Sequence, residues 1–104
     1  ETPEVTVARA ASEVAIREGF QKAIEAIDQN DPRRGLRALR TARSEARDLN
    51  FDLDDARILD HVRRLDTYLA ELQTRPLGLP DRKILRSGLL NQFDPPAKIV
   101  EPKN

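Results

Sequence analysis

Few residues in this chain have side chains suited to catalysis or metal binding. The chain has a single histidine, His61, and no cysteine. A histidine can act as a general base or a metal ligand, but it needs a nucleophile or further ligands at a suitable spacing. No serine or cysteine has such a spacing, and His61 falls at the edge of an apolar helical stripe. We therefore interpret His61 as a half-buried structural residue.

Three carboxylates cluster at Asp52, Asp54 and Asp55. Paired carboxylates can transfer protons or bind a hard cation, but this cluster lacks the D-x-[DN]-x-[DN]-G pattern of a calcium loop. The cluster comes directly before an apolar helical run, where acids accept backbone N–H groups and complement the helix dipole. We therefore predict that Asp52 caps this helix, with Asp55 three residues on in a carboxylate variant of the capping box.

The four glycines lie far apart, at Gly19, Gly35, Gly78 and Gly88, so no phosphate-binding glycine loop is present. Taken with the isolated histidine and the capping role of the aspartates, this predicts a chain that is not an enzyme. We expect no catalytic residue, no cofactor-binding residue and no metal ligand. No cofactor and no small-molecule substrate follow from the sequence.

The composition limits the classes of partner. Of the 104 residues, 18 are basic and 18 acidic, so no net field attracts nucleic acid or an anionic membrane. No apolar run approaches the roughly 20 residues that span a bilayer, so we expect no membrane span. Methionine is absent even at the first position. We therefore expect a processed product or a fragment of a larger protein, and leave its localisation open.

Helical spacing of apolar residues dominates the chain and predicts an all-α fold. We expect three antiparallel helices packed as a bundle, a short fourth helix, and an extended, proline-rich C-terminal tail. Turn, capping and proline signals bound the helices. The expected helices run over about 2–29, 32–49, 52–75 and 81–87, the last with Gly88 as its C-cap. Residues 1–93 then form one helical domain, and 94–104 form the tail.

The predicted core is aliphatic, because the chain has only three phenylalanines and one tyrosine. Its members recur at helical spacing along the three long helices, and the third helix contributes a narrow 4-3-4-3 seam. That seam is too short for a convincing coiled coil, so its simplest use is the core of the domain. The predicted core residues are Ile16, Phe20, Ala23, Ile27, Leu36, Leu39, Ala46, Ile58, Val62, Leu65, Leu69 and Leu72.

The apolar stripe of the first helix changes sides near Gly19. Val7, Ala11 and Val14 lie nearly opposite the later core positions when 100° is counted per residue. One interpretation is a helix that is kinked or begins late, with its first part frayed. The other is that the early face packs on something outside this fragment: a preceding domain, a second copy or a separate protein.

A second surface carries arginines, on the helix predicted over 32–49. Arg33, Arg37, Arg40 and Arg47 fall within one sector, opposite its leucine face. Such a row can follow a phosphate backbone or an acidic protein, or it can be a solvated face whose arginines pair with neighbouring acids. The zero net charge and the scarcity of stacking aromatics argue against nucleic acid.

The segment after the fourth helix holds the last candidate contact residues, Leu89, Leu90 and Phe93. They either cover an open edge of the bundle or form an exposed apolar patch. With the two surfaces above, they predict a non-catalytic protein-interaction or scaffolding module that contacts a protein partner or itself. The alternative is a nucleic-acid-associated helical module that uses the arginine row.

Two stretches resemble known helical families. Residues 23–46, AIEAIDQNDPRRGLRALRTARSEA, look like one helical hairpin of the tetratricopeptide type, with small residues at Ala23, Ala26, Gly35 and Ala42. No second repeat follows at a 34-residue period, and the family's aromatic positions lack aromatics. This resemblance implies a helical hairpin and no functional residue.

The order of elements over about residues 3–90 is similar to the helical region that follows the von Willebrand A domain in some bacterial proteins. The features that carry this likeness are the Asp31-Pro32 turn after a long helix, an Ala/Leu/Arg helix, a Leu-rich helix and the run Asp-Arg-Lys-Ile-Leu-Arg. The Asp-x-Ser-x-Ser metal motif of the A domain itself is absent. The resemblance implies an accessory helical module and no site residue.

Overall fold

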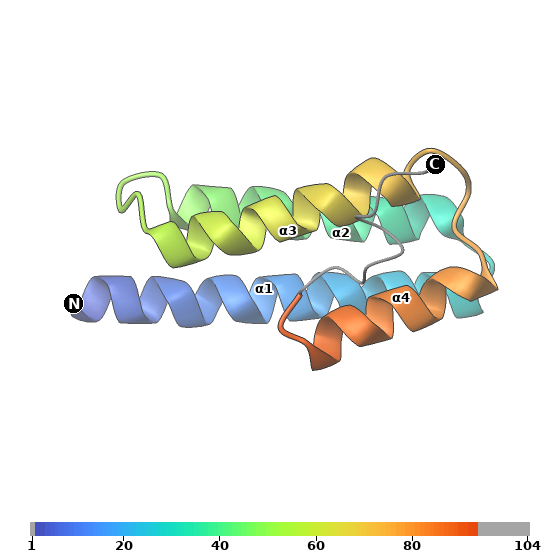
Figure 1. The fold of residues 1–104 in the computed structure, drawn as a ribbon, viewed down its shortest axis with the longest axis horizontal. Helices are drawn as coiled ribbons and strands as arrows, with labels where there is room; N and C mark the ends of the chain where they lie inside the picture. Colours follow the sequence, from blue (N-terminus) through green and yellow to red (C-terminus); the bar gives the residue numbers. More distant parts are fainter. Residues whose placement is uncertain (1, 94–104) are drawn as a thin grey trace, which may run out of the picture.

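The computed structural model describes residues 2–93 and is all-helical over that range, with no strand. Figure 1 shows four helices joined by short connections. They are α1 (Pro3–Asp28), α2 (Pro32–Leu49), α3 (Ala56–Leu72) and α4 (Leu79–Leu90). The tail predicted over residues 94–104 lies outside the described residues.

The chain sets the starts of α1 and α2 by local chemistry. Thr2 accepts the backbone N–H of Val5, and Asp31 accepts that of Arg34, so each cap satisfies a donor that the first turn leaves free. A proline directly follows each cap, with its φ already suited to a helix. The predicted bounds of these two helices are confirmed. Helix α1 begins at Pro3, so the interpretation of a late start is wrong.

Small residues let α1 and α2 approach each other closely. A Cβ added at Gly19 would lie 2.6 Å from the Cβ of Ala42 and 3.2 Å from the carbonyl oxygen of Ala38. Nothing larger than hydrogen fits there, because real Cβ contacts are not that short. This contact fixes the register in which the two helices lie side by side. The N-terminal half of α1 therefore lies beside the C-terminal half of α2 (Figure 1).

Helix α3 packs its apolar seam inward against α2 and α1, as predicted for the domain's own core. Three aromatic rings, of which only Tyr68 belongs to α3, also pack in this core. Phe20 meets Tyr68 edge-on at 5.0 Å between ring centroids and lies 5.5 Å from Phe93. All three rings are fully buried, so the centre of the core is partly aromatic. Every predicted core residue is buried except Leu36, which is half-buried at the edge.

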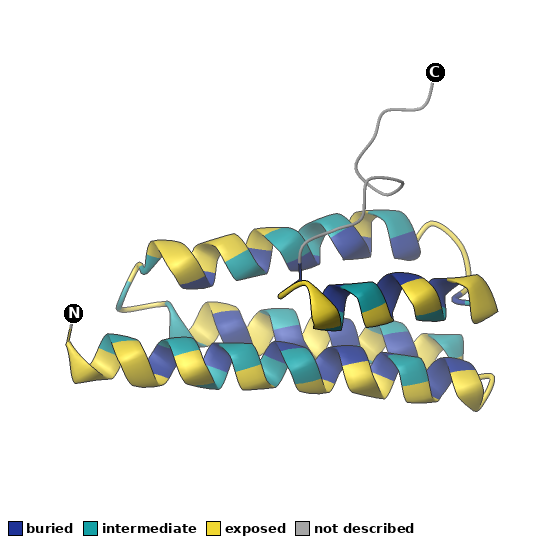
Figure 2. Ribbon diagram, turned by 60° about the horizontal axis from the view of Figure 1, so that its bottom comes forward, coloured by how far each residue is buried: buried dark blue, intermediate teal, exposed yellow. Residues whose placement is uncertain are grey.

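Helix α4 differs from its prediction. It runs over Leu79–Leu90 instead of 81–87, and it packs along the C-terminal half of α1 (Figures 1 and 2). Gly88 is not the C-cap but a buried residue within the helix. A Cβ at Gly88 would lie 2.4 Å from Phe20 Cε2 and 2.6 Å from Tyr68 Oη. The glycine is therefore a packing residue that lets α4 rest on the aromatic rings.

The start of α3 also differs, because Asp55 and not Asp52 is its N-cap. The Asn50 side chain bridges the Asp55 backbone, accepting its N–H at 2.6 Å and donating to its carbonyl at 3.1 Å. Asp54 adopts a left-handed φ of 49° inside this turn. Residues 52–55, which the prediction assigned to the start of the helix, therefore belong to the turn that precedes it. Within residues 2–93, no helix is both long and apolar enough to cross a membrane.

Candidate functional site

His61 lies at the edge of the core and is half-buried. Its ring meets Phe93 edge-on at 5.4 Å, and its Nδ1 has no hydrogen-bond partner among the described residues. Burial lowers the pKa of the imidazole, and the positive charge of Arg64 lowers it further. The neutral ring packed on an aromatic side chain agrees with the structural interpretation of this histidine.

The aspartate cluster separates in the structure. Asp55 accepts two hydrogen bonds from Arg9 of α1, at 3.1 and 2.7 Å, and also the backbone N–H of Ile58 at 3.1 Å. The hydrogen bond with Arg9 is the main cause that lowers the pKa of the Asp55 carboxyl from 3.8 to about 2. Asp52 and Asp54 remain exposed in the turn. Asp55 thus ties the start of α3 to α1.

A fourth acid, Asp81, has a structural role that the sequence analysis did not identify. Its side chain is fully buried. Its carboxylate accepts hydrogen bonds from both terminal nitrogens of Arg75 at 2.8 Å and from the backbone N–H of Gly78 at 2.7 Å. The carboxylate therefore closes the turn before α4 and satisfies a free N–H at the helix start. With these three hydrogen bonds, the buried Asp81 stabilises the fold.

The arginine row of α2 is only partly engaged. Arg40 donates to the Gln73 side chain at 3.1 Å, at the end of α3. Arg33, Arg37 and Arg47 are exposed, and their side chains form no ion pair or hydrogen bond within residues 2–93. The neighbouring Arg43 pairs with Asp66 of α3. Within the row, therefore, one arginine joins α2 to the end of α3 and three are exposed to solvent.

The early face of α1 remains uncovered by the domain's own helices. Val7 keeps 68% of its surface exposed and Val14 keeps 54%, whereas Ala11 is half-buried. Val7 and Ala11 line a shallow hollow of about 410 Å³ whose walls are almost wholly carbon. The remaining lining residues are Pro3, Glu4, Ala8 and Leu49. The structure thus joins the start of α1 and the end of α2 in one apolar surface.

The third group of candidates does not form a surface. Leu90 is 84% exposed, Leu89 is half-buried, and Phe93 is fully buried against Phe20. The assignment of Phe93 to a contact surface is therefore corrected. Its φ of 70° turns the chain back after α4, so that the ring enters the core. The guanidinium of Arg17 lies over the Phe93 ring, 5.7 Å from its centroid.

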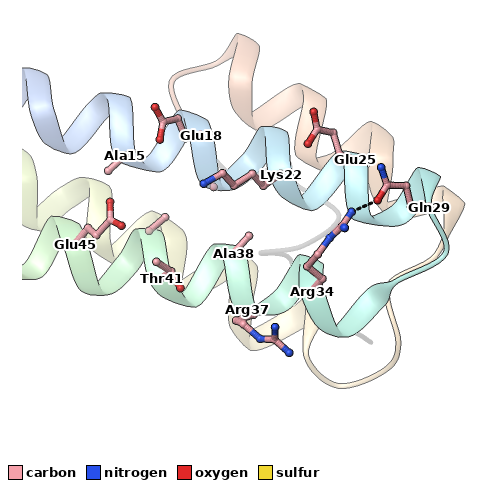
Figure 3. A pocket seen from close by; sticks show the side chains of 12 residues that line it. Ala15, Glu18, Lys22, Glu25, Gln29, Arg34, Arg37, Ala38, Thr41 and Glu45 are labelled. Carbon is pink, nitrogen blue, oxygen red and sulfur yellow. Dashed lines mark hydrogen bonds between the residues drawn. The ribbon is translucent and has the colours of Figure 1, made fainter.

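A second hollow follows the first along α1 and α2, with a volume of about 340 Å³ (Figure 3). One helical turn separates Ala11 of the first hollow from Ala15 of the second on α1, and Leu49 from Glu45 on α2. We call the two hollows together the outer groove. Of the polar rim of this second hollow, the sequence analysis identified only Arg37 and missed Glu18, Lys22, Glu25, Gln29, Arg34, Thr41 and Glu45.

The outer groove was hidden from sequence analysis for a physical reason. Its rim joins residues of two helices, and their pairing depends on the contact of Gly19 with Ala42. The periodicity of one helix gives the side on which Val7 lies, but not which residue of α2 stands opposite. The sequence signal for a close approach of the two helices is limited to the three alanines and one glycine on the floor of the second hollow.

No family model, curated protein or solved structure matches this chain.

Proposed function

We propose that this chain is a non-catalytic protein-interaction module whose contact surface is the apolar end of the outer groove. One observation carries the proposal. Val7, Ala11 and Leu49 converge from two helices on a carbon-lined hollow that the domain's own helices leave uncovered. Isolated apolar residues are common on protein surfaces, but a concave apolar surface made by two elements is typical of contact sites.

The scaffold that supports this surface is, in our proposal, an antiparallel three-helix bundle of α1, α2 and α3. The packing of α1 on α2, of α2 on α3 and of α1 on α3 supports it. The ion pair of Arg9 with Asp55 supports the contact surface directly, because it fixes α3 against the same half of α1 that carries Val7. Charge-assisted hydrogen bonds between Arg9 and Asp55 thus stabilise the position of the helix that carries the surface.

The experiment is affinity capture from an extract with three immobilised baits: the parent chain, Val7→Asp, and Gln21→Asp. Gln21 is exposed on the same helix and lines neither hollow, so it controls for the added charge. We expect proteins that the parent and Gln21→Asp retain but Val7→Asp loses, with equal thermal unfolding of all three. The same set of proteins on all three baits would contradict the proposal.

Light scattering across a concentration series separates self-association from binding to another protein. A dimer of the parent that dissociates on Val7→Asp, Val14→Asp substitution would assign the surface to a second copy. A monomer at all concentrations, with captured proteins, would assign it to a different partner.

The alternative function, association with nucleic acid, is favoured by the three solvent-directed arginines Arg33, Arg37 and Arg47. Binding through them would weaken steeply as salt rises, because phosphate contacts release counterions. A titration with duplex and single-stranded oligonucleotides between low and physiological salt tests it. Binding that is absent or insensitive to salt would remove this alternative.

A further inference from the structure

The floor of the outer groove is formed by small residues. In the second hollow the floor consists of Ala15, Gly19, Ala38 and Ala42, and the long side chains begin only at the rims. Figure 3 shows Glu18 and Lys22 along the α1 rim and Arg34, Arg37 and Glu45 along the α2 rim. A ligand in this groove would rest close to two helix backbones and meet charges on both sides.

The charges along the rims follow an order. Beyond the apolar end comes an acidic section, in which Glu18 of α1 and Glu45 of α2 stand on opposite rims (Figure 3). Lys22, Arg37 and Arg34 follow toward the turn that joins the two helices, with Glu25 as the one acid among them. The side chains of Glu18, Glu45, Lys22 and Arg37 form no ion pair or hydrogen bond with described residues. The groove therefore presents an apolar section, an acidic section and a basic section with net positive charge, in that order.

The natural occupant of a groove between two packed helices is another helix, which lays one face along the floor. The groove extends from the level of Val7 to that of Gln29, which are 22 residues apart on α1. At about 1.5 Å per residue this is about 33 Å, the length of a helix of about 22 residues. An extended peptide would gain less, because the two helices offer no unpaired backbone groups along the groove.

A second copy of the chain fits this order of sections poorly. Consider a two-fold dimer in which the grooves of the two copies run antiparallel. If the acidic section of each copy faces the basic section of the other, the apolar section of each copy faces the other copy's end of the groove at the turn between α1 and α2. Gln29 and Arg34 lie there, and they hydrogen-bond to each other. Placing the two apolar sections together instead leaves the charged sections without contact. A helix from a different protein has no such conflict.

We infer that the outer groove binds an amphipathic helix of a partner protein with a defined order of side chains along its facing side. Apolar side chains lie against Val7 and Leu49, basic ones against Glu18 and Glu45, and acidic ones against Lys22 and Arg37. The inference rests on the proposed function, because it assumes that the apolar end is a contact surface. It adds the secondary structure of the partner and the charge pattern that selects it.

Designed helical peptides test the inference by fluorescence anisotropy. Two labelled 22-residue peptides carry the order apolar, Lys, Glu along one face, one in each chain direction, because a helix can enter the groove either way. Two further peptides have Lys and Glu exchanged. We expect the better matched peptide to bind the chain about tenfold more tightly than its exchanged counterpart, since several exposed charge pairs each contribute a few-fold.

A charge-inverted protein provides the matched control. The variant Glu18→Lys, Lys22→Glu, Arg37→Glu, Glu45→Lys keeps the formal net charge at zero and changes only exposed residues. It should prefer the exchanged peptides, with circular dichroism showing that it remains folded. Val7→Asp should weaken the binding of all peptides.

Equal binding of matched and exchanged peptides to the parent would overturn the inference, and so would the absence of binding by all four. Either result leaves the capture experiment of the proposed function unaffected. A capture experiment in which Val7→Asp loses nothing would instead remove the apolar end itself as a contact surface.

Discussion

The two halves of α1 face different surroundings, although they form one helix. The C-terminal half is enclosed by α2 and α4, and its Phe20 ring packs against the rings of Tyr68 and Phe93. The N-terminal half turns only Ala8 and Ser12 fully inward and leaves Val7 and Val14 exposed. The difference shows that one continuous helix can be enclosed in the core at one end and leave apolar side chains exposed at the other.

The largest test of this comparison removes the central ring. Phe20→Ala should lower the free energy of unfolding by about 3–5 kcal/mol, because it leaves a cavity beneath Tyr68 and Phe93. Val14→Ala, in the other half of the same helix, should change it by less than about 0.5 kcal/mol. Urea unfolding followed by circular dichroism gives both values. Similar losses for the two variants would show that the halves are equally packed.

The next test concerns the close approach of α4. An exposed helical Gly→Ala substitution stabilises a helix by up to about 1 kcal/mol, but Gly88→Ala should destabilise by about 1–3 kcal/mol through overpacking against Phe20. The sign of the change is therefore decisive in urea unfolding. The Phe20→Leu substitution should lower the free energy of unfolding less in the Gly88→Ala variant than in the parent. A stabilised Gly88→Ala variant would refute the contact.

A pH-dependent test addresses the open half. Asp55 has a folded-state pKa of about 2 instead of 3.8. Its ionised form therefore stabilises the fold above about pH 4, and this contribution is lost as the pH falls through about 2. Asp55→Asn keeps a good capping residue but removes the charge that Arg9 binds. The variant should melt at a lower temperature than the parent at pH 6.

As the pH falls from 4 toward 2, the two melting curves should converge, because the parent then loses the same charge. A difference in melting temperature that stays constant between pH 6 and pH 2 would show that the Arg9–Asp55 pair does not stabilise the fold. Arg9→Met should reproduce the behaviour of Asp55→Asn, since it removes the other partner.

The smallest expected effect is on His61, at the edge of the enclosed half. Its pKa should lie below 6.5, so the neutral ring stabilises the fold above that pH and the contribution falls as the histidine is protonated. The chain has one histidine, so its ring protons give a single signal in a proton NMR titration. Phe93→Leu should move the pKa toward 6.5. A parent value at or above 6.5 would contradict the burial.

The sequence was sufficient where local chemistry decides the structure. The caps Thr2 and Asp31, each followed by proline, place two helix starts without reference to the rest of the chain. Of the twelve core residues predicted from apolar periodicity, eleven are buried in the structure. The exposed position of Val7 and Val14 also follows from periodicity alone, because their side differs from that of Phe20.

The sequence was insufficient where distant residues decide. Gly88 looked like a helix end because glycine commonly ends helices, and only the position of Phe20 shows why the helix continues through it. Asp52 and Asp55 are both suitable caps, and the bridge from Asn50 selects the second. Phe93 looked free after the last helix, but a left-handed turn returns it to the core. The order of charges in the outer groove required the pairing of α1 with α2.

The continuity of α1 has a consequence for the thermodynamics of association. Val7 lies 13 residues before Phe20 on the same uninterrupted helix, about 20 Å away at 1.5 Å per residue. The surface that we propose as the contact site is thus already ordered before any encounter, and binding there would require little loss of backbone entropy in this chain. Association should then proceed without coupled folding of this chain, so any entropic cost of folding on binding should come from the ordering of the partner's helix.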